Sequence, residues 1–257
     1  MGEHSADEGS IPSSSTTTTV ELVGVRPTGL PLALAELHRV TPVGGHLALR
    51  LPVAVLAAEL VTGAGFDVER VVPGGGDGGG AGSAVHATRA RTLPDFVGPG
   101  MGVLVCGLNP SLVAADAGFG YAGPTNRFWP AAVASGLVTR PRDPVHAVTE
   151  DHVGMTDLVK RATPGAGVLA REEYQAGAER VARLVDWLRP SVVLFVGLAG
   201  WRAAVDRRAT PGVQPEPFAG ATAYVMPSTS GLNAHSRLAD LTAHMVRART
   251  AAGLQTS

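Results

Sequence analysis

Long apolar runs and helical periods alternate along the second part of the chain. Nearly unbroken apolar runs occupy residues 103–107 (VLVCG), 191–197 (SVVLFVG) and 222–227 (TAYVMP), and each is followed by a loop and a segment with helical spacing. Such runs are typical of strands buried on both faces, and their alternation with helices indicates a parallel sheet covered on both sides. We therefore predict a three-layer α/β/α fold with a central, mainly parallel sheet over residues 85–257.

Helical periods support this prediction. The segment 171–188 places five apolar side chains on one helical face, namely Tyr174, Ala178, Val181, Leu184 and Leu188. Further helices are expected near 126–135, after residue 197 and from about 236 to 249, and a short strand is expected within HVGMTDLV. Because ligands bind outside the carboxyl ends of parallel strands, the stretches to search are GLNPS, VGLAG and MPSTSGLNAHS.

The first part of the chain has a different composition. Residues 1–18 are rich in Ser, Thr, Glu and Gly without an apolar period, which predicts a disordered N-terminus. Residues 19–73 show helix and strand periods and are expected to form a small accessory α/β segment. Residues 74–84 are interpreted as a glycine-rich flexible linker. No helix follows these glycines and no Lys-Ser/Thr pair is present, which argues against a phosphate-binding loop.

The accessory segment carries a resemblance of its own. The stretches ALAELHRVTPVGGHLALRLP and ELVTGAGFDVERV resemble the rear part of a class I methyltransferase, and the front part with its glycine-rich cofactor loop is absent. We therefore expect an accessory subdomain without methyl transfer.

Composition and charge exclude several classes of protein. One cysteine, Cys106, leaves no disulfide framework and no four-cysteine zinc or iron–sulfur site. No stretch is apolar and uncharged enough to span a membrane, and the polar N-terminus has no secretory signal pattern, so we expect a cytoplasmic protein. Residues 1–100 carry six basic and ten acidic residues, whereas residues 101–257 carry 15 basic and 12 acidic ones. The mildly basic second part permits a surface that faces DNA.

The predicted strand ends offer amides and hydroxyls rather than strong acids and bases. GLNPS contributes an amide and a hydroxyl, and MPSTSGLNAHS contributes hydroxyls, an amide and His235. At these strand ends neither a zinc-binding HExxH nor a closely spaced carboxylate pair occurs. Such a site suits a reaction whose leaving group departs largely by itself, while the protein positions reactants and stabilises charge.

Two motifs resemble those of a known family. GLNPSLVAADAGFGYAGPTNRFWPAAVASGL and VMPSTSGLNAHS, about 120 residues apart, resemble the two motifs of the mismatch-specific uracil/thymine-DNA glycosylases. The resemblance covers roughly residues 87–250 and implies the α/β fold of the uracil-DNA glycosylases. The iron–sulfur branches of that superfamily need four cysteines, whereas this chain has one. The branch that acts on uracil in any context has Asp where Asn109 stands, so the resemblance to the mismatch-specific branch remains.

The resemblance implies a role for particular residues. Asn109 matches the asparagine that orients the attacking water; an Asn-Pro turn that caps a strand is the alternative, which the presence of the second motif disfavours. The base-binding positions implied are Gly107, Leu108, Ser111, Phe119 and Tyr121, with Tyr121 stacked on the base. Leu232 matches the wedge that enters the base stack when the target nucleotide is extruded. Its loop supplies the other implied DNA-binding residues, which are Ser228, Ser230, Gly231, Asn233, Ser236 and Arg237. Ser236 is also a candidate helix N-cap.

Three positions depart from the family pattern. Ser111 replaces a glycine that commonly follows Asn-Pro, and Leu198 stands where relatives often have lysine. Asp116 is a carboxylate near the motif that either assists the water as a general base or caps the loop. These departures bear on the range of lesions more than on the reaction.

The resemblance implies a monofunctional DNA glycosylase of base-excision repair, nucleoid-associated and monomeric. Its partner would be double-stranded DNA containing uracil, or thymine or a modified pyrimidine mainly opposite guanine. No metal or other cofactor is implied, and Lys160 is the only lysine, which disfavours Schiff-base chemistry. Two alternatives stay open, namely a non-catalytic module that binds damaged DNA and a hydrolase of free nucleosides.

Overall fold

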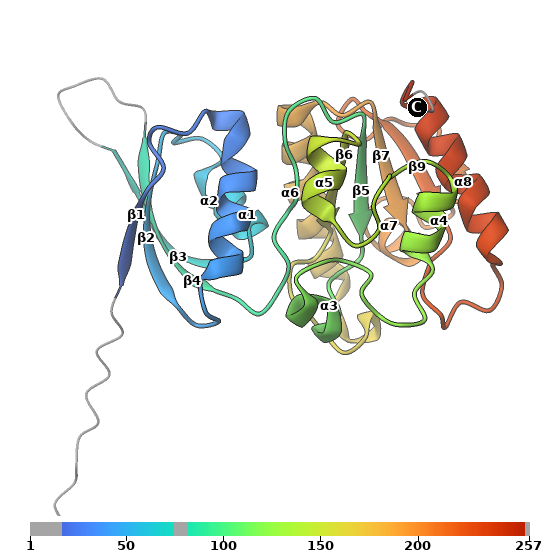
Figure 1. Cartoon of the computed structure of the whole chain (residues 1–257), viewed down its shortest axis with the longest axis horizontal. Helices are drawn as coiled ribbons and strands as arrows, with labels where there is room; N and C mark the ends of the chain where they lie inside the picture. The colour runs from blue at the N-terminus through green and yellow to red at the C-terminus, as the bar shows by residue number, and fades with distance from the viewer. Residues whose placement is uncertain (1–16, 75–81, 255–257) are drawn as a thin grey trace, which may run out of the picture.

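The computed structural model describes residues 17–74 and 82–254, which form two sheets with their flanking helices (Figure 1). The smaller sheet has the order β1-β2-β4-β3, in which β1 and β2 are parallel and the remaining pairs are antiparallel. Its strands and helices are β1 (Thr18–Glu21), α1 (Leu30–Val40), β2 (His46–Leu51), α2 (Ala57–Gly63), β3 (Phe66–Pro73) and β4 (Ser83–Arg89), with a 3-10 turn at Pro27–Gly29.

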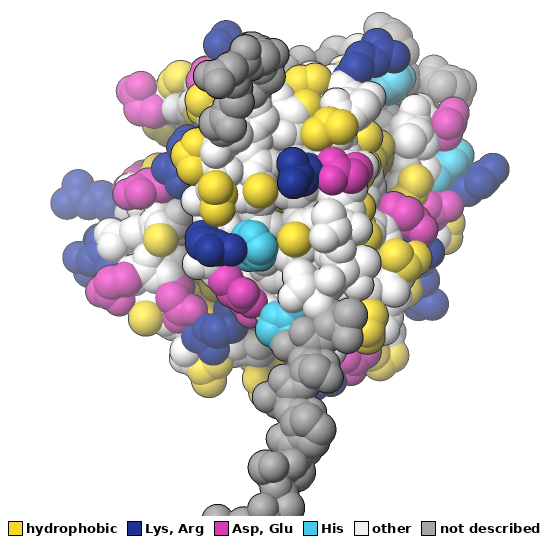
Figure 2. Space-filling model, turned by 90° about the vertical axis from the view of Figure 1, so that its left-hand side faces the viewer, with side chains coloured by type: hydrophobic (Ala, Val, Ile, Leu, Met, Phe, Trp, Pro, Cys, Tyr) yellow, Lys and Arg dark blue, Asp and Glu magenta, His cyan; other side chains and the backbone are white. Residues whose placement is uncertain are grey.

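Strict alternation along β2 explains how this sheet is oriented. Leu47, Leu49 and Leu51 are buried, whereas the side chains between them are half-buried or exposed. The buried set packs on α1 and α2, so the helices cover one face of the sheet and the other faces solvent. Figure 2 shows that charged side chains of both signs and histidines are scattered over this solvent face, without a large patch of one sign.

The position of β4 corrects the predicted domain boundaries. Residues 83–89 pair with both β2 and β3, so the small unit extends beyond residue 73 and the glycine-rich stretch joins two strands of one sheet. Residues 75–81 of the predicted linker lie outside the described residues, as do residues 1–16 of the predicted disordered N-terminus. The boundary was misplaced because a glycine-rich stretch between two strands has the same composition as an interdomain linker.

The larger sheet has the order β6-β5-β7-β9-β8. Its strands are β5 (Val103–Gly107), β6 (Val153–Asp157), β7 (Val192–Val196), β8 (Gly212–Val213) and β9 (Thr222–Met226). All of its strand pairs are parallel except the short β8–β9 pair at one edge. The predicted mainly parallel sheet is therefore confirmed, including the short strand within HVGMTDLV.

Helices cover both faces of the larger sheet, as predicted. One face is covered by α4 (Phe128–Ala134) and α8 (Leu238–Ala251), and the other by α6 (Arg171–Leu188) and α7 (Leu198–Ala204). The short helices α3 (Leu112–Ala117) and α5 (Pro144–Thr149) and a 3-10 turn at Ala166–Val168 complete the set. None of the helices in the described ranges is long and apolar enough to cross a membrane.

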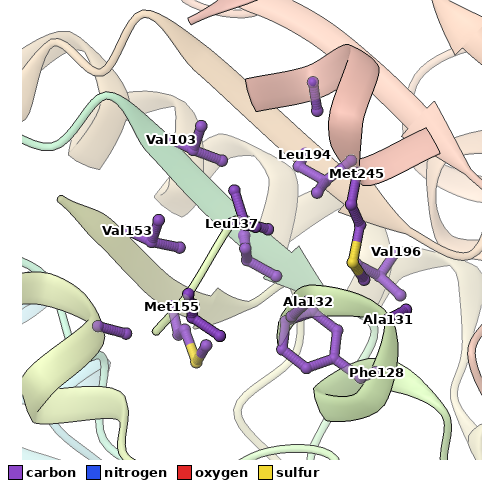
Figure 3. Close-up of a cluster of buried hydrophobic side chains, with 14 of the residues drawn as sticks. Val103, Phe128, Ala131, Ala132, Leu137, Val153, Met155, Leu194, Val196 and Met245 are labelled. Carbon is purple, nitrogen blue, oxygen red and sulfur yellow. The ribbon is translucent and has the colours of Figure 1, made fainter. Parts of the chain in front are cut away.

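Alternate residues of β5 build the two layers of core. Val103 and Val105 face the α4/α8 layer, where Figure 3 shows Phe128 and Met245 among the packed side chains. Leu104 and Cys106 face the α6/α7 layer. All of these side chains are fully buried, and each large apolar one contributes about 1.5–3 kcal/mol through burial.

A buried ion cluster lies where the two units meet. The Asp95 carboxylate accepts from Arg180 Nη1 at 2.7 Å and from Lys160 Nζ at 2.8 Å. The backbone N–H of Asp95 donates to the Gly63 carbonyl at the end of α2, at 2.8 Å. Trp187 packs against the cores of both units. Asp95 thus connects the small sheet unit to β6 and α6 of the larger one.

Candidate active site

A cavity of about 410 Å³ opens at the carboxyl ends of β5, β6, β7 and β9. It lies between the loop that follows β5 and the loop that follows β9, so the two sequence motifs meet although about 120 residues separate them. This is the position at which parallel α/β sheets bind ligands. The predicted residues that line it are Gly107, Leu108, Asn109, Ser111, Tyr121, Ser228, Ser230, Gly231 and Leu232.

Gly107 leaves open space at the floor of the cavity. A Cβ atom at this position would lie 2.3 Å from Oδ1 of Asp157 and 3.1 Å from the hydroxyl of Tyr121. Any other residue at position 107 would therefore displace the carboxyl group and fill the space beside it. The missing side chain allows a flat ligand to approach the backbone at the end of β5.

The Asn109 amide is held by its nitrogen. Nδ2 donates to Thr163 Oγ1 at 2.8 Å, to the Arg161 carbonyl at 3.0 Å and to the Pro110 carbonyl at 3.1 Å. Thr163 Oγ1 in turn donates to the Gly165 carbonyl at 3.0 Å, so it can only accept from Asn109. These acceptors determine which way the amide faces, and among the described residues no donor contacts Oδ1. The amide oxygen remains available to a water in the cavity.

The two aromatic residues with a predicted base-binding role differ in their placement. The Tyr121 ring lines the cavity and stacks on Phe128, with ring centroids 3.9 Å apart and planes 13° apart. Its backbone has φ of 60°, a left-handed conformation that is uncommon for a residue with a side chain and is often found at functional sites. Burial raises the pKa of its hydroxyl well above the usual value, and this hydroxyl has no described hydrogen-bond partner. Phe119 is absent from the cavity lining and packs edge-on against Trp129, which corrects its predicted base-binding role.

The loop after β5 is fixed by backbone bonds to the loop after β6. The carbonyls of Gly107 and Leu108 accept from the N–H groups of Leu158 and Val159, at 3.0 and 2.9 Å. The Leu108 side chain packs against the start of α7, close to Gly200. Ser111 lines the cavity and caps α3, because its Oγ accepts from the Ala114 N–H at 3.1 Å.

Leu232 is the most exposed large apolar side chain in the described part of the chain, at 96% exposure. Arg127 stabilises the loop that carries Leu232, because its guanidinium donates to the carbonyls of Ser230 at 2.8 Å, Asn233 at 2.7 Å and Ser236. Arg127 also donates its backbone N–H to the Thr229 carbonyl. An exposed leucine on a loop with a fixed backbone is suited to insertion into another molecule.

Three predicted DNA-binding residues lie outside the cavity lining. Asn233 stabilises the loop, because its Nδ2 donates to the Ser228 carbonyl at 2.8 Å and to Ser236 Oγ at 3.2 Å. Ser236 is buried, and Arg237 rather than Ser236 is the N-cap residue of α8, which corrects that prediction. Arg237 is exposed and pairs with Asp240 at 3.3 Å.

Asp116 has neither of the two roles considered for it. It lies within α3, outside the cavity lining, and pairs through both oxygens with Arg91, at 2.8 and 2.6 Å. The Arg91 hydrogen bonds hold the pKa of this exposed carboxyl below its usual value. Leu198 begins α7 and packs against the core on that side of the sheet.

Asp157, which was not among the predicted site residues, lines the cavity at the end of β6. Burial, with a smaller contribution from the Asp95 charge, raises its pKa to about 6 against the opposing effects of Lys160 and Arg180. The same signal that identified Asn109, a polar side chain at the end of an apolar run, was present in HVGMTDLV. No group of three or more His, Cys, Asp or Glu side chains that could hold a metal occurs in the described ranges.

Both motifs lie within the part of the chain that matches a protein-family model. The chain matches the family model of the uracil DNA glycosylase superfamily over residues 94–250, more than half of its length. It is also similar to a solution NMR structure of a candidate uracil DNA glycosylase from Methanosarcina acetivorans, with 20% identity and a TM-score of 0.43. That likeness covers 61% of this chain and 96% of the other.

Proposed function

The chain belongs to the uracil DNA glycosylase superfamily, and from this premise we propose that it extrudes uracil, or a related pyrimidine opposite guanine, from duplex DNA and hydrolyses its N-glycosidic bond. The observation that carries the proposal is the Asn109 amide. Its nitrogen is saturated by protein acceptors, and its oxygen is left free beside a cavity between the two motif loops.

In the proposed mechanism Asn109 orients the water rather than deprotonating it. An amide oxygen is too weak a base to remove the proton, but it accepts a hydrogen bond and holds the water toward the sugar carbon. The glycosidic bond breaks largely before the water attacks, and negative charge develops on the departing base. Backbone N–H groups of the loop 107–111 would stabilise that charge, and the reaction would leave an abasic site.

The wedge in this proposal is Leu232. Extrusion of a nucleotide costs a few kcal/mol, because stacking and pairing are lost. An apolar side chain that fills the vacated space offsets part of that cost. The Leu232 side chain, which is 96% exposed beside the cavity, fits this role. A hydrolase of free nucleosides would not need such a side chain, because it has no base stack to enter.

The proposal is tested by base release from a duplex with one U·G pair, measured as alkali-labile abasic sites under single-turnover conditions. Asn109→Ala should keep the fold and lower the rate by about 10²–10³-fold, because the water loses its orientation. An exposed surface change in the edge strand β8, Val213→Ala, should leave the rate unchanged. A rate for Asn109→Ala close to that of the wild type would refute the assignment. Duplex binding without base release by the wild type would instead favour a non-catalytic damage-binding module.

A further inference from the structure

Two of the three acceptors that bind the Asn109 nitrogen come from one loop, which lies outside both sequence motifs. They are the Arg161 carbonyl at 3.0 Å and Thr163 Oγ1 at 2.8 Å. The loop spans residues 161–170 and lies between β6 and α6. The backbone N–H of Thr163 also donates to the Pro110 carbonyl at 3.1 Å, so this end of the loop follows the chain beside Asn109. The direction of the Asn109 amide therefore depends on where residues 161–163 lie.

An ion pair joins the two ends of this loop. The Arg161 guanidinium donates through Nε to Glu173 Oε1 at 2.8 Å and through Nη2 to Glu173 Oε2 at 2.9 Å. Nη2 also donates to the Val168 carbonyl at 3.4 Å. Glu173 lies in the first turn of α6, and its Oε2 accepts from the Ala170 N–H at 2.8 Å. Both ends of the loop are thus bound to a single carboxylate on a helix.

The pair is suited to hold the loop rather than to stabilise the whole fold. The side chains of Arg161 and Glu173 are 53% and 30% exposed, and exposed ion pairs contribute little to the free energy of folding. Two parallel hydrogen bonds, however, fix the direction of the guanidinium as well as its distance. The loop contains Gly165 and Gly167, whose backbones have more freedom than those of other residues, so a fixed contact at its ends restricts its conformations.

The direction of the amide decides how a water is held. With its nitrogen bound by the loop, Asn109 presents its oxygen to the cavity. That oxygen accepts a hydrogen from the water and leaves the lone pairs of the water free to attack. A reversed amide would present its nitrogen, which donates to the water and occupies a lone pair that the attack needs. Loss of the loop acceptors would therefore slow the chemical step without changing how DNA is bound.

We propose that Arg161 and Glu173 are positioning residues, whose ion pair holds the loop 161–170 so that the amide oxygen of Asn109 faces the attacking water. This inference rests on the function proposed above. Neither Arg161 nor Glu173 lines the cavity, so both act through Asn109 and not on the substrate.

The first measurement is the rate of uracil release from a U·G duplex with the enzyme in saturating excess. Arg161→Met and Glu173→Ala should each lower this rate by about tenfold, because the amide is no longer held in one direction. The double variant should be no slower than the slower single variant, since each change removes the same contact. Arg39→Met, which breaks an exposed ion pair with Glu36 on α1, is the matched control and should leave the rate unchanged. Wild-type rates for both single variants would overturn the inference.

The second measurement repeats Arg161→Met in a protein that already carries Asn109→Ala. Because the pair acts through Asn109, the added change should have no further effect on the residual rate. A general disturbance of the fold would instead lower the rate by the same factor with and without Asn109, and this result would overturn the inference.

Affinity for DNA gives a third readout. Binding is measured with a U·G duplex whose uridine carries a fluorine on the sugar and resists cleavage. Arg161→Met should bind this duplex as tightly as the wild type. Weaker binding with a normal rate at saturation would show that Arg161 contacts a phosphate, and it would overturn the positioning role while leaving the proposed function intact. Absence of uracil release by the wild type would overturn the proposed function itself.

Discussion

Asn109 follows β5 and Asp157 ends the neighbouring strand β6, and both line the same cavity, but their surroundings give them different chemistry. Three acceptors bind the Asn109 nitrogen and direct its oxygen outward. Asp157 has no side-chain hydrogen-bond partner among the described residues, and burial raises the pKa of its carboxyl group to about 6. Asn109 could be predicted because it sits in a motif that resembles a known family. The pKa of Asp157 depends on Asp95, Lys160 and Arg180, whose positions follow only from the fold.

At the scale of single residues, Leu232 gives the sharpest prediction. Leu232→Ala should lower uracil release from a U·G duplex by about tenfold or more, because the space left by the extruded nucleotide is no longer filled. The stability of the protein should not change, since the side chain is almost fully exposed. Hydrolysis of a free nucleoside, if the enzyme supports any, should be unaffected.

The matched control is Leu238→Ala, an exposed leucine in the first turn of α8. It should leave the duplex rate unchanged. The wedge assignment fails if the two leucine variants have the same rate.

At the scale of elements, the start of α4 and the loop after β9 form one unit. The Asn126 side chain accepts from the Phe128 N–H at 2.9 Å just before α4, while Arg127 binds three carbonyls of the loop that carries Leu232. The helix itself was predicted from its apolar spacing. The contact between Arg127 and the loop joins residues more than 100 positions apart, so no local pattern could reveal it.

The Arg127 clamp can be tested by Arg127→Met, which keeps the length of the side chain but removes its donors. The loop carbonyls lose their partners, so we expect faster proteolysis near Leu232 and a fall of about tenfold in duplex base release. Extrusion can be followed directly by the fluorescence of 2-aminopurine placed beside the target. Arg189→Met, at an exposed arginine that pairs with Asp186, should change neither readout. An Arg127→Met variant with normal extrusion would show that the loop holds its shape without the clamp.

At the scale of the whole molecule, the small sheet unit and the larger domain meet at Asp95. Its carboxylate is buried together with Arg180 and Lys160, and its backbone bonds to the end of α2. Burial alone would raise the Asp95 pKa, but the two cations hold it below the usual value of 3.8. Folding therefore favours the ionised form, and the associated stability is present at neutral pH and lost as the pH falls through the folded pKa.

Asp95→Ala should lower the free energy of unfolding at pH 7 by about 3–5 kcal/mol, because it leaves Arg180 buried without its carboxylate. Urea denaturation measures the change. The difference from the wild type should shrink as the wild-type Asp95 becomes protonated at acidic pH. Asp67→Ala, an exposed carboxylate of β3, should cost little at any pH. If Asp95→Ala unfolds like the wild type at pH 7, the ion cluster does not stabilise the junction.

The sequence alone determined the larger sheet, its helices and the identity of the motif residues. The buried strand 103–107 and the amphipathic helix 171–188 can be predicted from the spacing of apolar residues within each segment, without knowledge of tertiary contacts. Phe119 and Ser236 were assigned wrong roles because a motif gives the order of residues, not the direction in which each side chain points. The strand β4 was missed as part of the small sheet because the glycine-rich stretch before it has the composition of an interdomain linker.

Only the tertiary structure decided which of these residues share a site. Parallel strands bring their carboxyl ends to one edge of the sheet, and this places Asn109, Asp157 and the Leu232 loop around a single cavity. The pKa of Asp157 depends on burial and on charged side chains that several elements bring to that edge. No single stretch of sequence therefore determines it. The hydrophobic pattern therefore specified the scaffold, whereas the chemical state of the site depends on contacts between residues far apart in the chain.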